Sequence, residues 1–243
     1  MAELQYERRD AAALSAMLGV PAVEVHGRIG STNDRAHVLA DAGAPAMSVV
    51  LADTQTAGRG RHGRTWASAA GAGVWVSIIL RPADARTTQV LALRTGLALA
   101  EALEPLRDGP LRLKWPNDLF AGEGKLAGIL IEARWQDERP LWVVVGVGVN
   151  VVPPPGVGAE GLPGASRLDV LAAVVTAVRT AAAGRGPLTE DERAAWACRD
   201  LARGRLIRSP AEGTVVGIDP NGGLQVQHGD VVATFHAGSL LFA

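Results

Sequence analysis

The stretch LWVVVGVGVNVV, residues 141–152, decides the fold of this chain. It is nearly all valine, and β-branched residues favour strands because their side chains pack well on a pleated surface. A strand that is apolar on both of its faces lies in the interior of a sheet. We therefore expect residues 141–152 to form a central strand.

Other apolar segments flank this stretch along the chain. Strands are expected at residues 23–26, 47–52, 74–80, 111–115 and 126–134. Residues 31–34, Ser-Thr-Asn-Asp, offer side chains that can cap the start of a helix. Further helices are expected at residues 85–106, 166–183 and 189–203. Strands and helices that follow one another in this way predict an α/β (α+β) domain.

The end of the chain has a different pattern. After Arg205 the sequence consists of short apolar runs with turns at residues 219–223 and 228–230. Asn221-Gly222 between apolar runs is typical of a β-hairpin. We expect residues 1–205 to form the larger α/β domain and residues 206–243 a small all-β barrel.

Composition and charge exclude several classes of protein. The formal net charge is −1, so the chain has no global positive field with which to coat a nucleic acid. No apolar run is long enough to span a bilayer, and the first ten residues have no signal-peptide pattern. The single cysteine, Cys198, excludes an internal disulfide. We expect a cytoplasmic protein that does not bind a membrane.

The two lysines mark the first candidate for the chemistry. The chain has 24 basic residues, and only Lys114 and Lys125 are lysine. They lie in KWPND, residues 114–118, and GKLAG, residues 124–128. A compact ammonium on a flexible stem can fill a role that a planar guanidinium cannot. A compositional bias toward arginine explains the background but not these two positions.

The loop GRGRHGR, residues 58–64, combines three glycines with three arginines. Glycine lets a backbone approach a ligand closely, and arginine donates forked hydrogen bonds to carboxylate or phosphate. The pattern indicates a mobile loop that wraps an anionic ligand, with a solvated basic turn or an RNA-binding segment as alternatives. If it is a lid, residues 56–68 are mobile when empty, and the arginines gain partners only when the ligand is bound.

Two strand ends carry further candidates. Pro116 ends a strand and holds Asn117 and Asp118 at its end, where ligands bind in α/β folds, unless this is an ordinary turn. Glycines in the strand GVGVN, residues 146–150, indicate close approach of a ligand or another backbone. Asn150 then either contacts a nucleotide or simply ends the strand. Neither segment fits a P-loop or a dinucleotide fingerprint, and the histidines lack metal-ligand spacing.

Five motifs in order, STN (31–33), QTAGRGRHGR (55–64), KWPND (114–118), KLAGIL (125–130) and GVGVN (146–150), resemble the biotin protein ligases, or biotin–[acetyl-CoA-carboxylase] ligases. The resemblance covers residues 25–152 and continues more loosely to the end. It implies a mixed-sheet catalytic domain with an SH3-like C-terminal β-barrel. It also implies that biotin and ATP, with Mg²⁺, form biotinyl-5′-AMP and pyrophosphate. The biotinyl group then passes to a lysine of a biotin carboxyl carrier domain of acetyl-CoA, acyl-CoA or pyruvate carboxylase.

The resemblance assigns roles to individual residues. Lys125, Arg61, Arg59 and Asp118 would act in catalysis, with Asp118 binding Mg²⁺ or orienting the acceptor amine. The biotin site would comprise Ser31, Thr32, Asn33, Gln55, Arg59, Gly60, Arg61, Lys125 and Gly128. The ATP site would comprise Arg61, Arg64, Asn117 and Asn150. Some members cover adenine with a tryptophan after the GVGVN strand, but residues 151–167 contain no aromatic.

Larger members carry a winged helix ahead of the STN motif and act as repressors. Only about thirty residues precede Ser31, which favours the monofunctional type, a monomer or weak homodimer without specific DNA binding. Lipoate ligase or octanoyltransferase activity is the nearest alternative in the same superfamily. A nucleic-acid-binding module that uses the arginine loop is the alternative from another class.

Overall fold

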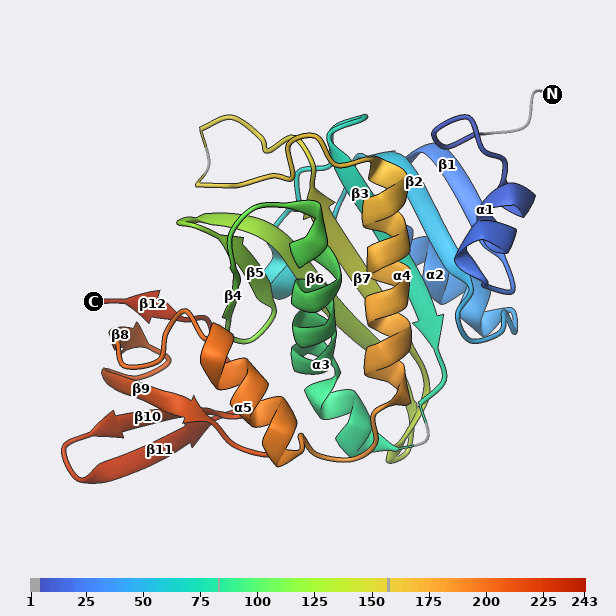
Figure 1. The fold of residues 1–243 in the computed structure, drawn as a ribbon. Helices are drawn as coiled ribbons and strands as arrows, with labels where there is room; N and C mark the ends of the chain where they lie inside the picture. Colours follow the sequence, from blue (N-terminus) through green and yellow to red (C-terminus); the bar gives the residue numbers. More distant parts are fainter. Residues whose placement is uncertain (1–4, 83, 157) are drawn as a thin grey trace.

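A mixed sheet of seven strands forms the centre of the molecule (Figure 1). The computed structural model describes residues 5–82, 84–156 and 158–243. The strand order is β1-β2-β3-β7-β6-β5-β4, with β1 and β2 parallel and the other neighbours antiparallel. The strands are β1 (Val23–Ile29), β2 (Val49–Gln55), β3 (Gly73–Leu80), β4 (Leu111–Lys114), β5 (Asp118–Ala121), β6 (Gly124–Gln136) and β7 (Arg139–Asn150).

The valine-rich strand β7 is central, as its sequence predicts. It lies between β3 and β6, with three strands on either side of it in the sheet. Val143, Val145 and Val147 face the main core, whereas Val144 faces a second, smaller core on the opposite side. Both faces of β7 are therefore covered.

Helices cover the two faces unequally. The helices are α1 (Ala11–Leu18), α2 (Thr32–Asp41), α3 (Ala85–Leu103), α4 (Arg167–Ala183) and α5 (Glu190–Arg199), with short 3-10 turns η1 (Arg61–Gly63) and η2 (Glu104–Leu106). Helices α3 and α4 pack side by side on one face of the sheet (Figure 1). Helix α2 packs on the other face, over β2, β3 and β7. It leaves the part of that face over β6 free for a pocket.

The C-terminal residues form a second, five-stranded antiparallel sheet. Its strands are β8 (Leu206–Ser209), β9 (Gly213–Ile218), β10 (Leu224–His228), β11 (Val231–Phe235) and β12 (Leu241–Phe242), in the order β11-β10-β9-β8-β12. Both expected turns join neighbouring strands, β9 to β10 and β10 to β11. Within the described residues, no pairing between β11 and β12 closes the sheet.

This sheet shares its core with the larger one. Ile207 and Leu240 belong to the same buried cluster as Trp115 of the large sheet. The Trp115 indole Nε1 also donates a hydrogen bond of 3.0 Å to the carbonyl of Gly222, in the β9–β10 turn. The domain boundary expected at residues 205 and 206 therefore does not separate two hydrophobic cores.

Three elements differ from expectation. Asp118 begins strand β5, which pairs with β4 so that Lys114 lies opposite Asp118. A four-residue strand directly after a proline turn has too little sequence to show a period of two. Helix α1 was not expected either, because its alanine-rich sequence has no clear apolar stripe. The second C-terminal helix, expected to reach residue 203, ends at Arg199.

Helix α5 is tied to the end of α3 by an ion pair. The Arg199 guanidinium contacts both carboxylate oxygens of Glu104, which lies in η2. The hydrogen bond from Arg199 is the main reason why the pKa of Glu104 lies below its ordinary value, and the Leu111 amide acts in the same direction. In the described residues no helix is long and apolar enough to cross a membrane.

Candidate active site

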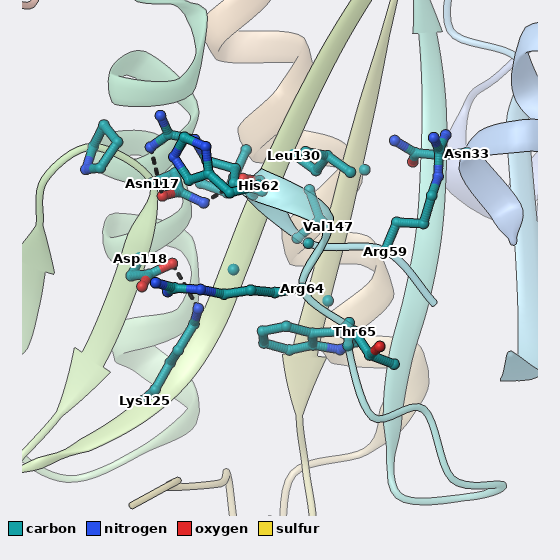
Figure 2. A pocket seen from close by; sticks show the side chains of 18 of the residues that line it. Asn33, Arg59, His62, Arg64, Thr65, Asn117, Asp118, Lys125, Leu130 and Val147 are labelled. Atoms are coloured by element: carbon teal, nitrogen blue, oxygen red, sulfur yellow. Dashed lines mark hydrogen bonds and ion pairs between the residues drawn. The ribbon is translucent and has the colours of Figure 1, made fainter. Parts of the chain in front are cut away.

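A pocket lies beside α2, on the part of the sheet face that this helix does not cover (Figure 2). It brings together residues of β4, β5, β6 and β7, the start of α2 and the arginine loop. Twelve of the thirteen predicted site residues line it: Ser31, Thr32, Asn33, Gln55, Arg59, Gly60, Arg61, Arg64, Asn117, Asp118, Lys125 and Gly128.

Neutral hydrogen-bonding groups form one end of the pocket. The backbone amide and hydroxyl of Thr32 both donate to Gln55 Oε1, over 2.8 and 3.0 Å. Gln55 Nε2 donates in turn to Ser68 Oγ over 2.9 Å. Ser31 caps α2, because its hydroxyl accepts from the Asp34 amide. These bonds fix the start of α2 against β2 and the loop.

Asn33 is held by residues that the sequence analysis did not single out. Its Nδ2 donates to Glu132 Oε2 over 2.8 Å, and its Oδ1 accepts from the buried Ser77 hydroxyl. A Cβ added at Gly146 would overlap the Asn33 amide group. Gly146 therefore makes room for a side chain of the protein itself, which the sequence analysis did not anticipate.

Trp66 is the second residue that the sequence analysis missed. Its indole lies against Gly128 of β6 and Gly148 of β7, where a Cβ would overlap the ring. Its far side faces the pocket, with Lys125 Nζ 5.0 Å from the ring centroid. A signal was present: one tryptophan close to the arginine loop, and single glycines in two neighbouring strands. Connecting them requires the pairing of β6 with β7.

The arginine loop is an organised turn. Gly60 N donates to Arg64 O over 2.7 Å, and Trp66 N donates to Gly58 O over 2.9 Å. Arg59 Nη2 lies 2.6 Å from Glu132 Oε2 and 2.7 Å from Asp34 Oδ1. The expectation that these arginines lack partners without a ligand is therefore wrong for Arg59. The loop lies close to α2 and β6, which supply carboxylates within reach.

Arg61 also has a partner within the protein. Its Nη1 donates to Asn117 Oδ1 over 3.3 Å, and Asn117 is itself fixed by bonds to both backbone groups of Ile129. Burial lowers the pKa of Arg61, although a guanidinium stays protonated at neutral pH. Arg61 is a half-buried cation on the pocket wall.

Lys125 and Asp118 form an ion pair at the cationic end, with Lys125 Nζ 2.7 Å from Asp118 Oδ1 (Figure 2). The Arg64 side chain extends toward this pair in the same view. Of the described residues that line the pocket, Asp118 is the only one with a carboxylate. An anion that enters this end meets more positive than negative charge.

Asn150 does not join the other predicted residues. It is buried, it does not line the pocket, and its Nδ2 donates to the backbone carbonyl of Lys125 over 3.3 Å. The same backbone segment pairs with residues 158–160, through Lys125 N to Gly158 O and Glu160 N to Lys125 O. Asn150 thus supports Lys125 from behind, and a direct contact with the nucleotide is not supported by this geometry.

The described residues contain no group of three or more histidine, cysteine, aspartate or glutamate side chains that could hold a metal alone. Any cation at this pocket would have Asp118 as its carboxylate ligand and would need further oxygens from a substrate.

A family comparison decides the family of this chain. Residues 26–150 match the model described as the biotin/lipoate A/B protein ligase family, and these residues include every predicted site residue. The chain belongs to this ligase family. The catalytic part of the fold and the pocket are therefore those of a biotin/lipoate-type ligase.

Two relatives are similar to this chain over about half of its length. The bifunctional ligase/repressor BirA of Bacillus subtilis is 41% identical over 127 residues, which are 52% of this chain and 39% of that protein. The biotin–[acetyl-CoA-carboxylase] ligase of Mycobacterium tuberculosis is 44% identical over 139 residues, 55% of this chain and 50% of that protein. The match thus spans half or less of the length of these relatives.

A solved ligase structure matches over a larger part of the chain. The biotin protein ligase of Aquifex aeolicus, in complex with biotin and ATP, superimposes with a TM-score of 0.78 at 26% identity. The match covers 91% of this chain and 99% of that one. The mixed sheet and the second, C-terminal sheet are thus the fold of a biotin protein ligase.

Proposed function

We propose that this protein is a biotin protein ligase, which uses ATP to join biotin to a lysine of a carrier domain. One observation carries the proposal: a hydrogen-bonding end and a cationic end share one pocket. Biotin has the matching distribution, a neutral ureido ring at one end and a carboxylate at the other. The Mycobacterium tuberculosis and Aquifex aeolicus relatives bear names of the same activity.

In the first step, a carboxylate oxygen of biotin attacks the α-phosphorus of ATP. The bond from that phosphorus to the bridging oxygen breaks, and pyrophosphate leaves with the electron pair. Both reactants are anions, so fixed cations must offset their repulsion and stabilise charge on the phosphate oxygens. Lys125, Arg61 and Arg64 are among the cations on the pocket wall, and they can do this.

In the second step, the acceptor lysine amine attacks the acyl carbon of biotinyl-5′-AMP. An amide bond forms, AMP leaves, and the amine loses a proton. Asp118 is suited to orient the incoming amine, because it already accepts an ammonium at 2.7 Å from Lys125. The acceptor would be a biotin carboxyl carrier domain of an acetyl-CoA, acyl-CoA or pyruvate carboxylase.

Chemistry with ATP implies Mg²⁺, and Asp118 fits that ion as well. Magnesium in such sites is held by one or two carboxylates together with phosphate oxygens, not by a cage made of protein alone. Asp118 would supply the carboxylate and ATP the remaining oxygens. Once bound, the ion would offset negative charge on the phosphates.

The family also contains lipoate ligases, so lipoate or octanoate is the second candidate substrate. Isotope exchange between ATP and pyrophosphate separates these possibilities, because it reports the first step alone. Biotin should support the exchange, and lipoate and octanoate should not. Exchange with lipoate but not biotin would replace the proposal with the alternative. No exchange with any of the three acids would refute a ligase function of this type.

A further inference from the structure

The second lysine of the chain, Lys114, has no role in the steps above. It is the last residue of β4, opposite Asp118 in the β4–β5 hairpin. Its side chain lines the same pocket as Lys125. Both lysines of this arginine-rich chain therefore lie at one site.

The ammonium of Lys114 has aromatic neighbours where an anionic partner would be expected. Its Nζ lies 5.7 Å from the ring centroid of Phe120 and 5.4 Å from that of Phe242. The one carboxylate of the pocket, Asp118, is paired with Lys125. Among the described residues, no carboxylate forms an ion pair with Lys114. It is thus a half-buried cation that has no ion-pair partner of its own among the described residues.

The surrounding charges make this corner more positive. Burial lowers the pKa of Lys114, attraction to Asp118 raises it, and the neighbouring Lys125, Arg64 and Arg205 lower it again. The Arg205 guanidinium lies 3.6 Å from the ring centroid of Phe242. Lys114 contacts the same ring, so the two cations are neighbours. Cations that repel one another in a half-buried site are stabilised when a polyanion binds among them.

The C-terminal sheet completes this corner. Ser239, Leu240 and Leu241 line the pocket, and the ring of the next residue, Phe242, lies with its centroid 5.4 Å from Lys114 Nζ. The cationic corner therefore lies at the wall formed by β4 and the end of the chain. The hydrogen-bonding residues Thr32 and Gln55 come from other elements of the same pocket, α2 and β2.

We propose that Lys114 binds the β- and γ-phosphates of ATP and holds the pyrophosphate that leaves in the first step. The inference rests on the proposed function and adds a separate subsite to it. As the bond to the α-phosphorus breaks, negative charge develops on the departing β-phosphate, and the Lys114 ammonium stabilises it. Lys125 and Arg61 instead contact the biotin carboxyl group and the α-phosphate, which become part of biotinyl-5′-AMP.

The competing explanation is structural: Lys114 holds Phe242 in place, and with it the pocket wall. The two explanations differ in what the substitution alters. A pyrophosphate contact affects ATP and pyrophosphate, but not biotinyl-5′-AMP, which lacks the β- and γ-phosphates. A loosened wall affects all of these ligands, and a substitution of Phe242 would reproduce it.

The test compares Lys114→Met, Lys114→Arg and Phe242→Leu in the full chain, with Arg139→Met at an exposed, distant position as control. The measurements are inhibition of the first step by inorganic pyrophosphate, the KM for ATP, the KM for biotin, and transfer from supplied biotinyl-5′-AMP. Binding of inorganic pyrophosphate to each protein is also measured by calorimetry.

In Lys114→Met, the inhibition constant of pyrophosphate and the KM for ATP should rise about tenfold to a hundredfold, as for loss of one charged hydrogen bond. The KM for biotin and the transfer rate should stay within about twofold. Lys114→Arg should retain most of the pyrophosphate binding, and Phe242→Leu and Arg139→Met should behave as the parent.

Unchanged pyrophosphate inhibition in Lys114→Met, or equal losses for all ligands in Lys114→Met and Phe242→Leu, would overturn the inference. If Lys114→Met does not fold, equal calorimetric affinity of the parent and Phe242→Leu for pyrophosphate supports the subsite, and a tenfold loss in Phe242→Leu contradicts it. These outcomes concern Lys114 alone, because failure of the proposed function would instead show as no biotin-dependent exchange in the parent.

Discussion

Lys125 is a small cation between two very different neighbours, the Asp118 carboxylate at 2.7 Å and the Trp66 ring at 5.0 Å. A guanidinium at this position would be wider and planar, and would have to displace one of them. Reactants held even slightly out of place can lose about a hundredfold in rate. Lys125→Arg should therefore lower the rate of biotin-dependent pyrophosphate exchange by about that factor, with the thermal unfolding temperature unchanged.

Arg107→Lys is the matched control, because it also replaces one type of cationic side chain with the other. Arg107 is partly exposed, and its guanidinium donates to the nearby carbonyls of Gly109 and Pro110. This variant should retain the parent rate. Near-parental exchange in Lys125→Arg would show that charge alone suffices at position 125.

At the scale of elements, one glycine in β6 and one in β7 let Trp66, which follows the arginine loop, pack on the sheet. A Cβ at Gly148 would lie 2.5 Å from Trp66 Nε1, so Gly148→Ala should push the indole and its loop outward. Such overpacking costs about 1–3 kcal/mol of unfolding free energy. Urea unfolding should show this loss, and the KM for biotin should rise. Gly30→Ala, where a Cβ has open space, should leave both unchanged; equal effects in the two variants would contradict the packing argument.

The ion pair between η2 and α5 predicts a dependence of stability on pH. Because the hydrogen bond from Arg199 lowers the pKa of Glu104 below 4.5, folding favours the ionised form. The pair therefore stabilises the protein above that pH, and the contribution is lost as pH falls through the lower, folded-state pKa. Glu104→Gln should be less stable than the parent at pH 7 by about 1 kcal/mol or less.

The difference between parent and Glu104→Gln should shrink below about pH 4.5, as followed by urea unfolding at several pH values. The exposed Glu123→Gln is the control and should differ little from the parent at any pH. A gap for Glu104→Gln that stays constant down to pH 3 would show that the loss has a cause other than this ionisation.

Sequence patterns predicted elements well where apolar residues run continuously or a cap is present. The valine run of β7, the apolar run of β3 and the cap at Ser31 all appear in the structure as expected. Contacts between distant elements were not predictable in this way. Trp66 lies 82 positions before Gly148. Only the pairing of β6 with β7 places Gly128 and Gly148 side by side beneath the Trp66 ring.

In the candidate site, too, local motifs were predictable and contacts between distant residues were not. Motif order located twelve lining residues, whereas Asn150 lies outside the pocket lining and donates to the Lys125 backbone carbonyl. Local spacing predicts the strand on which a side chain lies. It does not predict which neighbour satisfies that side chain.

At the scale of the whole molecule, the two sheets should unfold together, because they share one buried cluster. Calorimetry should show a single transition whose calorimetric and van't Hoff enthalpies agree. Trp115→Phe removes the bond to Gly222 and should lower the midpoint of that single transition, with about 1 kcal/mol lost. Trp135→Phe, at a 44% exposed position, should not. An early, separate transition of the C-terminal sheet would contradict the shared core.

The position of the last strand bears on how the protein can be handled. Leu241 lines the pocket, and the Phe242 ring lies against Arg205, so a peptide tag fused after Ala243 would emerge at the mouth of the site. Helix α1, near the other terminus, lies on the opposite side of the large sheet (Figure 1). Purification handles, fluorophores and surface linkers therefore belong at the N-terminal end, where they leave the approach of a bulky acceptor protein unobstructed.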